Sequence, residues 1–183
     1  LWKQQPFAPV WDALTREAAQ SRIAVRWIFD AIRQFGVHTA QPVFDLAAKH
    51  ADEGVVGIGL GGDEILGPAR PFGPLFKQAR RRGLRLTSHA GETAGPDSIW
   101  QALEIGAERI GHGIRSIEDQ HLVHHLASHK IPLEISITSN VRTGAVASMG
   151  EHPVRSLYDA GVPIILNTDD PALFGCTLRS EYA

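Results

Sequence analysis

The stretch LRLTSHAGE, residues 84–92, decides the fold. It contains a short β-strand followed directly by a histidine and a glutamate, His89 and Glu92. Apolar and β-prone residues lead into it, and a turn follows at Gly95-Pro96. His89 therefore stands where the strand stops, and Glu92 follows three residues later on the loop. A histidine and a carboxylate in this arrangement suit a metal ligand beside a general acid.

The same alternation of strand and helix runs through the rest of the chain. We expect strands at residues 23–32, 55–60, 84–88, 109–111, 132–137 and 163–167. We expect helices at residues 12–20, 42–52, 72–82, 96–105, 117–130 and 152–160. The run 23–32 fits a strand or a helix on periodicity alone, and Pro42 is expected to open its helix, where proline is tolerated. About six strand-then-helix units are typical of parallel α/β architecture.

Composition indicates one globular domain covering residues 1–183, since 43% of the residues are hydrophobic and no linker divides the chain. The formal net charge is -2 and the longest basic run is Arg80-Arg81-Arg82, so no nucleic-acid partner is expected. No apolar run reaches about 18 residues, so no membrane partner is expected. The single cysteine, Cys176, excludes an intrachain disulfide and a multi-cysteine metal site, which fits a cytoplasmic protein.

Two parallel arrangements compete for this pattern: an open doubly wound sheet and a closed (β/α)8 TIM barrel, which typically needs about 250 residues. Length alone favours the open sheet. The polar residues favour the barrel, because they follow the ends of different strands: Asp63 and Glu64, His89 and Glu92, His112, Asn140, Asp169 and Asp170. Only in a barrel do all those ends converge on one face. We therefore predict an α/β fold in which the chain supplies about six units of a (β/α)8 barrel.

Two further strand ends carry candidate chemistry. The sequence NTDDP, residues 167–171, places Asp169 and Asp170 directly after an apolar run. Such a turn can simply hydrogen-bond its own backbone, but charge at the edge of a core costs free energy unless it is paired or metal-bound. The sequence RIGHG, residues 109–113, flanks His112 with glycines. A lone histidine is more often structural, yet flanking glycines let a ligand approach closely.

Two other patterns are weaker. The glycines of residues 57–62 formally match the dinucleotide fingerprint, but they lie within a strand and no helix follows them. Gly61 and Gly62 instead indicate a place where backbone amides approach a planar ligand. His121, His125 and His129 recur every four residues on one helix, and without an H-E-x-x-H pattern they indicate a solvated helix face.

Four motifs taken together resemble the adenosine/adenine deaminase family of the metal-dependent amidohydrolase superfamily. These motifs are GGDE (61–64), SHAGE (88–92), RIGHG (109–113) and NTDDP (167–171). The resemblance implies a (β/α)8 barrel with one divalent metal, usually zinc, and the hydrolytic replacement of an exocyclic amine by oxygen.

The same resemblance implies a role for individual residues. His89 and Asp169 match metal ligands, and Glu92 matches the acid that protonates ring nitrogen 1 of a purine. His112 matches the residue that polarises the attacking water. Asp170 and the backbone amide of Gly62 would hold the purine at its other ring nitrogens.

One feature of the family is missing from this sequence. The family has a His-x-His metal-binding pair at the end of its first strand, and no His-x-His occurs here. We therefore expect the chain to correspond to strands three to eight, the C-terminal portion of the barrel, with only His89 and Asp169 of the metal shell. The N-terminal part of the barrel would come from the same or another polypeptide.

These features lead to the hypothesis that the protein deaminates a 6-aminopurine nucleoside and releases ammonia. The stretch ITSNVRTG, residues 137–144, resembles bacterial branches that include 6-amino-6-deoxyfutalosine deaminases of menaquinone biosynthesis. Adenosine, adenine and that futalosine derivative remain open, although residues 61–64 argue mildly against free adenine. The rival functions are hydrolysis of another amide or ester, which the pair Asp169-Asp170 with Glu92 disfavours, and a non-catalytic binding domain on the same fold.

Overall fold

The structure, a computed structural model, describes residues 6–183, so residues 1–5 of the predicted single domain lie outside the described part. The described chain contains one six-stranded sheet in the order β1-β2-β3-β4-β5-β6, and every neighbouring pair is parallel. The strands are β1 (Trp27–Ile32), β2 (Val55–Gly61), β3 (Arg85–Ala90), β4 (Arg109–His112), β5 (Leu133–Ile135) and β6 (Ile164–Leu166). All six predicted strands are confirmed, and the ambiguous run 23–32 contains a strand.

Helices separate the strands in the predicted alternation. They are α1 (Phe7–Gln20), α2 (Val37–Lys49), α3 (Gly73–Arg81), α4 (Pro96–Glu104), α5 (Gln120–Ser128), α6 (Ile137–Arg142), α7 (Val154–Asp159), α8 (Pro171–Phe174) and α9 (Leu178–Glu181). Short 3₁₀ turns lie at Arg33–Phe35, Ala51–Glu53, Arg70–Phe72, Ile114–Glu118 and Met149–Glu151. None of the helices in the described residues is long and apolar enough to cross a membrane.

The start of α2 differs from the prediction. The helix begins at Val37, so Pro42 lies inside it rather than in its first turn. Proline removes the hydrogen bond that its amide would donate to the carbonyl of His38. Both residues are exposed, so water can satisfy that carbonyl and the helix continues past the proline. A second difference is at Ile137, which was expected in a strand and instead opens α6.

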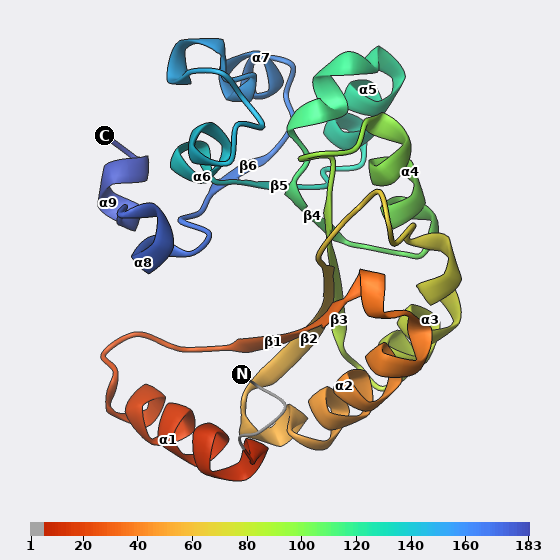
Figure 1. Cartoon of the computed structure of the whole chain (residues 1–183), viewed down its shortest axis with the longest axis vertical. Coiled ribbons are helices and arrows are strands. Elements are labelled where there is room, and N and C mark those ends of the chain that lie inside the picture. The colour runs from red at the N-terminus through yellow and green to blue at the C-terminus, as the bar shows by residue number, and fades with distance from the viewer. Residues whose placement is uncertain (1–5) are drawn as a thin grey trace.

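The sheet curves into an arc with helices α2 to α5 along its outer side (Figure 1). Within the described residues β1 and β6 each pair with one strand only, so the arc is open between them. Six parallel strands with outer helices form part of a (β/α)8 barrel, as predicted. Two apolar clusters, one around Phe76 and one around Leu122, fill the space between strands and helices.

The two-residue period of the strands determines which side chains face the barrel interior. In β3, Leu86, Ser88 and Ala90 are buried, whereas Thr87 and His89 are only half-buried and line a hollow on the inner face. The outer positions of the strand therefore build the core, and its inner positions are left for polar side chains.

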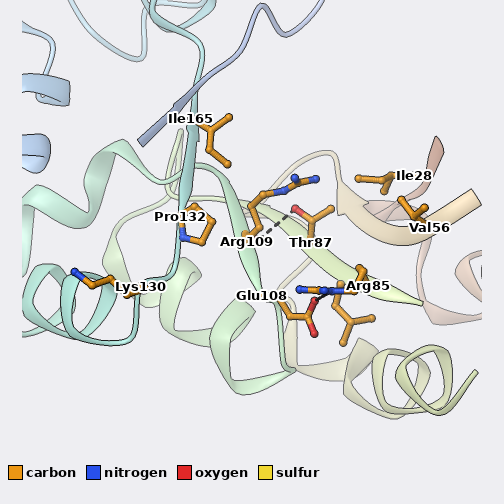
Figure 2. Close-up of a pocket in the computed structure, with 10 residues that line it drawn as sticks. Ile28, Val56, Arg85, Thr87, Glu108, Arg109, Lys130, Pro132 and Ile165 are labelled. Carbon is orange, nitrogen blue, oxygen red and sulfur yellow. Dashed lines mark hydrogen bonds and ion pairs between the residues drawn. The ribbon is translucent and has the colours of Figure 1, made fainter. Parts of the chain in front are cut away.

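Hollows lie at both ends of the strands. The one at the N-terminal ends has a volume of about 370 Å³ and contains an Arg85–Glu108 ion pair and a hydrogen bond from the Thr87 hydroxyl to the Arg109 carbonyl (Figure 2). The one at the C-terminal ends is smaller, about 130 Å³, and is lined by His89, His112 and Asp169. Barrel enzymes keep their sites at the C-terminal ends, so the smaller hollow is the candidate site.

Candidate active site at the carboxyl ends of the strands

Three of the predicted residues meet at the ends of β3 and β4. The Nε2 atom of His89 lies 3.3 Å from Oε2 of Glu92, and the Nε2 atom of His112 lies 3.7 Å from the same oxygen. The two imidazole rings are 4.5 Å apart between centroids. The three side chains offer ligand atoms that all lie within 4.8 Å of one another, so they form a candidate metal-binding group.

Asp169 lines the same hollow but stands outside that close group. Its Oδ2 atom accepts a hydrogen bond of 2.6 Å from the hydroxyl of Ser139, and its backbone amide donates to Oδ1 of Asn167. Its φ angle is 54°, in the left-handed region that side-chain-bearing residues rarely adopt. Strained backbone of this kind clusters at functional sites, because surrounding contacts must hold it in place.

The other two predicted residues are not brought into this hollow. The carboxylate of Asp170 caps α8 by accepting a hydrogen bond of 3.1 Å from the amide of Leu173. Gly62 follows β2 with a φ angle of 92°, and a Cβ atom there would lie 2.2 Å from Oε1 of Gln34. The glycine is therefore required locally, and substrate binding by Gly62 and Asp170 stays a prediction.

Glu64 has a role that sequence reasoning missed. Its buried carboxylate accepts hydrogen bonds from the backbone amides of Gly91, Glu92 and Thr93 at 2.6, 3.0 and 3.0 Å, and from the hydroxyl of Ser98 at 2.5 Å. Burial alone would raise the pKa of Glu64, but hydrogen bonds from His89, Ser98 and the backbone outweigh it and lower the pKa well below its usual value. An ionised Glu64 therefore fixes the loop that carries Glu92.

His89 occupies a position that favours positive charge. Burial would lower its pKa, but the hydrogen bonds and negative charges of Glu64 and Glu92 outweigh burial and raise the pKa to about 9. Its Nε2 atom lies 3.6 Å from Oε1 of Glu64 and 3.3 Å from Oε2 of Glu92. Imidazole and carboxylate are also the ligand types that zinc takes in proteins, so the residues present fit such a metal.

Arg33, also missed from the sequence, holds the end of β3. Its buried guanidinium donates hydrogen bonds to the carbonyl of Leu60, the hydroxyl of Ser88 and the carbonyl of His89. It thereby joins the ends of two neighbouring strands directly behind His89.

The two oxygens of Glu92 have different surroundings. Oε1 accepts hydrogen bonds of 3.1 Å from Nδ2 of Asn140 and of 3.1 Å from the hydroxyl of Thr143, whereas Oε2 faces the two histidines. Burial raises the pKa of Glu92, but the His89 hydrogen bond, the charges of His112 and His89 and the Thr143 hydrogen bond together lower it. Burial, followed by the charge of His89, lowers the pKa of His112.

Comparison with known proteins decides the family. The family model described as adenosine deaminase matches residues 6–183. The chain belongs to the adenosine deaminase family. This family is metal-dependent, in agreement with the group formed by His89, Glu92 and His112.

Individual family members are similar over nearly the whole chain. An aminodeoxyfutalosine deaminase from Streptomyces avermitilis is 45% identical over 175 residues, covering 94% of this chain and 49% of that protein. An adenosine deaminase from Yersinia pseudotuberculosis is 42% identical over 172 residues, covering 93% of this chain and 51% of that protein. The solved adenine deaminase from Arthrobacter aurescens has a TM-score of 0.87 at 32% identity, covering 94% of this chain and 53% of that one. The chain thus spans about half the length of the relatives it matches.

Proposed function

We propose that this adenosine deaminase family member hydrolyses the exocyclic amine of a 6-aminopurine nucleoside and releases ammonia. The observation that carries the proposal is the setting of Glu92, a buried carboxylate that presents one oxygen to two histidines at the end of a barrel. The similarity to an aminodeoxyfutalosine deaminase and to an adenosine deaminase supports a 6-aminopurine compound as substrate.

His89 and Asp169 would hold a divalent metal, with zinc favoured by the ligand types. The remaining ligands, a His-x-His pair, belong in this proposal to the N-terminal part of the barrel, on the same or another polypeptide. Such a metal, when bound, would lower the pKa of a water to about 7 and so supply a nucleophile at neutral pH.

Glu92 would act as the general acid. Because Oε1 already accepts hydrogen bonds from Asn140 and Thr143, the proton to be transferred belongs on Oε2. Transfer of that proton to ring nitrogen 1 makes the neighbouring carbon electrophilic.

His112 would orient the attacking water, and Asp170 and the backbone amide of Gly62 would hold the other ring nitrogens of the purine. These three roles rest on the family motifs. A cytoplasmic location is part of the proposal, because a single cysteine, Cys176, fits a reducing compartment.

A second candidate substrate is 6-amino-6-deoxyfutalosine, which keeps the 6-aminopurine base. An aminodeoxyfutalosine deaminase that is 45% identical over 94% of this chain supports it.

The experiment compares rates of ammonia release from adenosine, aminodeoxyfutalosine and adenine by the purified protein together with its N-terminal barrel part. We expect both nucleosides to react faster than adenine. A preference for free adenine contradicts the proposed substrate class. Absence of both bound metal and ammonia release would instead favour a non-catalytic binding domain.

A further inference from the structure

A row of hydrogen bonds leads from the start of α7 into the candidate site. It begins at the backbone amide of Val154, which donates to Nδ1 of His152 over 3.1 Å. His152 is 7% exposed, and its Nε2 atom lies 3.2 Å from Oδ1 of Asn140. Because a backbone amide can only donate, Nδ1 of His152 carries no proton and Nε2 must carry one.

This first bond fixes the direction of the next ones. The Nε2 proton of His152 requires an acceptor, so the atom of Asn140 that faces it is the carbonyl oxygen. The amide nitrogen of Asn140 then points the other way, at 3.1 Å from Oε1 of Glu92 and 2.9 Å from Nδ1 of His112. A flipped amide would set two acceptors against each other at Glu92 and two donors against each other at His152.

The two hydrogens of the Asn140 amide match these two acceptors. Nδ1 of His112 therefore accepts a hydrogen bond, and in the neutral ring the proton lies on Nε2, the atom 3.7 Å from Oε2 of Glu92.

We propose that His152 and Asn140 are positioning residues. The Val154 amide donates to His152, His152 donates to Asn140, and Asn140 donates to His112 and Glu92. These bonds fix the Nε2-protonated tautomer of His112 and the orientation of Glu92. The consequence for the reaction rests on the proposed function. A His112 with hydrogen on Nε2 can orient and stabilise an oxygen that becomes negative, but it cannot take up the proton of that oxygen. Glu92, held through Oε1, keeps Oε2 turned to the substrate.

The charge state of His152 agrees with this arrangement. Burial lowers its pKa to about 4, against the opposing charge of Glu181, so the ring is neutral near pH 7. A doubly protonated His152 would instead point an N–H group at the Val154 amide.

The direct test is nitrogen-15 NMR of the histidine rings, which distinguishes protonated from unprotonated ring nitrogens and needs no turnover. We expect Nδ1 to be unprotonated and Nε2 protonated in both His152 and His112. A proton on Nδ1 of His112 in the unmutated protein overturns the proposal.

Two substitutions separate positioning from folding. His152→Asn keeps an acceptor near the position of Nδ1 for Val154 but is too short to donate to Asn140, whereas His152→Gln places a donor near the position of Nε2. We expect His152→Asn to mix the tautomers of His112 and to lower kcat by about 10- to 100-fold with little change in KM. His152→Gln should restore a single tautomer and most of kcat, and His121→Asn, on the exposed face of α5, serves as the control.

Equal losses of kcat in His152→Asn and His152→Gln, or an unchanged His112 tautomer in His152→Asn, would refute positioning by His152. The expected tautomers in a protein that releases no ammonia from any purine would support the positioning and refute the proposed function.

Discussion

Glu92 is held by Asn140 and Thr143 through one carboxylate oxygen and turns the other towards His89 and His112. Replacement by Gln keeps an acceptor for Asn140 but leaves no acidic proton to transfer. We expect Glu92→Gln to lower kcat by about 10²- to 10⁴-fold, the usual contribution of a general acid, with unchanged metal content. Ammonia release and metal analysis measure both quantities. Glu17→Gln, on the exposed side of α1, is the matched control, and an active Glu92→Gln protein would contradict the assigned role.

Glu64 makes a different contribution, to stability. Three backbone amides and the Ser98 hydroxyl donate to its carboxylate, and Gln would offer one acceptor and turn an NH₂ group towards some of these donors. We expect Glu64→Gln to lower the free energy of unfolding by about 2 to 4 kcal/mol, since hydrogen bonds to a buried charge are lost. Urea unfolding at pH 7 measures this loss. A midpoint equal to that of Glu17→Gln would show that the loop is held by other contacts.

At the scale of elements, the strands were predictable and some helix boundaries were not. Short apolar runs between turn residues indicate buried strands, and β2 and β3 lie where those runs are. Helix starts depend on single contacts instead. The start of α5 at Gln120 is set by Asp119, whose carboxylate accepts from the amides of His121 and Leu122. The start of α2 depends on whether water can reach the His38 carbonyl that Pro42 leaves without a donor. The sequence does not reveal that exposure.

His152, two residues before α7, makes stability depend on pH. Folding lowers the pKa of His152 from 6.5 to about 4, so between these values only the unfolded chain binds this proton. The free energy of unfolding should therefore fall as the pH decreases from 6.5 to about 4, and this group adds nothing further below that. Urea unfolding across this range measures the slope, which should be shallower in His152→Asn.

His89 does not interfere with that measurement in metal-free protein. Its folded pKa is raised to about 9, so its stabilisation is complete below pH 6.5 and is lost only as the pH rises through 9. An identical slope in the unmutated protein and in His152→Asn would mean that His152 does not stay neutral in the fold.

For the whole molecule, the candidate metal would join parts of the barrel that are far apart in the chain. His89 ends β3 and Asp169 follows β6, at the far edge of the sheet (Figure 1). A metal that binds only the folded state adds to stability by mass action, about 2.7 kcal/mol at about 100 times Kd. We expect zinc to raise the Tm of the chelator-treated protein together with its N-terminal barrel part, and chelation to abolish ammonia release reversibly.

Calorimetry with and without zinc measures this stabilisation, and His89→Ala is the variant that should remove it. If His89→Ala gained as much in Tm from zinc as the unmutated protein, the metal would be bound elsewhere.

The sequence by itself determined the alternating order of strands and helices and the residues at the strand ends, including His89, Glu92, His112 and Asp169. These features are local or periodic, and the motifs that carry the family resemblance are short and keep their order. Only the tertiary structure decided which oxygen of Glu92 faces the site and which atoms Asn140 turns towards His112. Those contacts join residues 48 and 28 positions apart, and they exist only because the parallel strand ends converge. The donor at the start of the hydrogen bonds that lead to His112 is the backbone amide of Val154. The sequence does not reveal which side chain a backbone amide contacts.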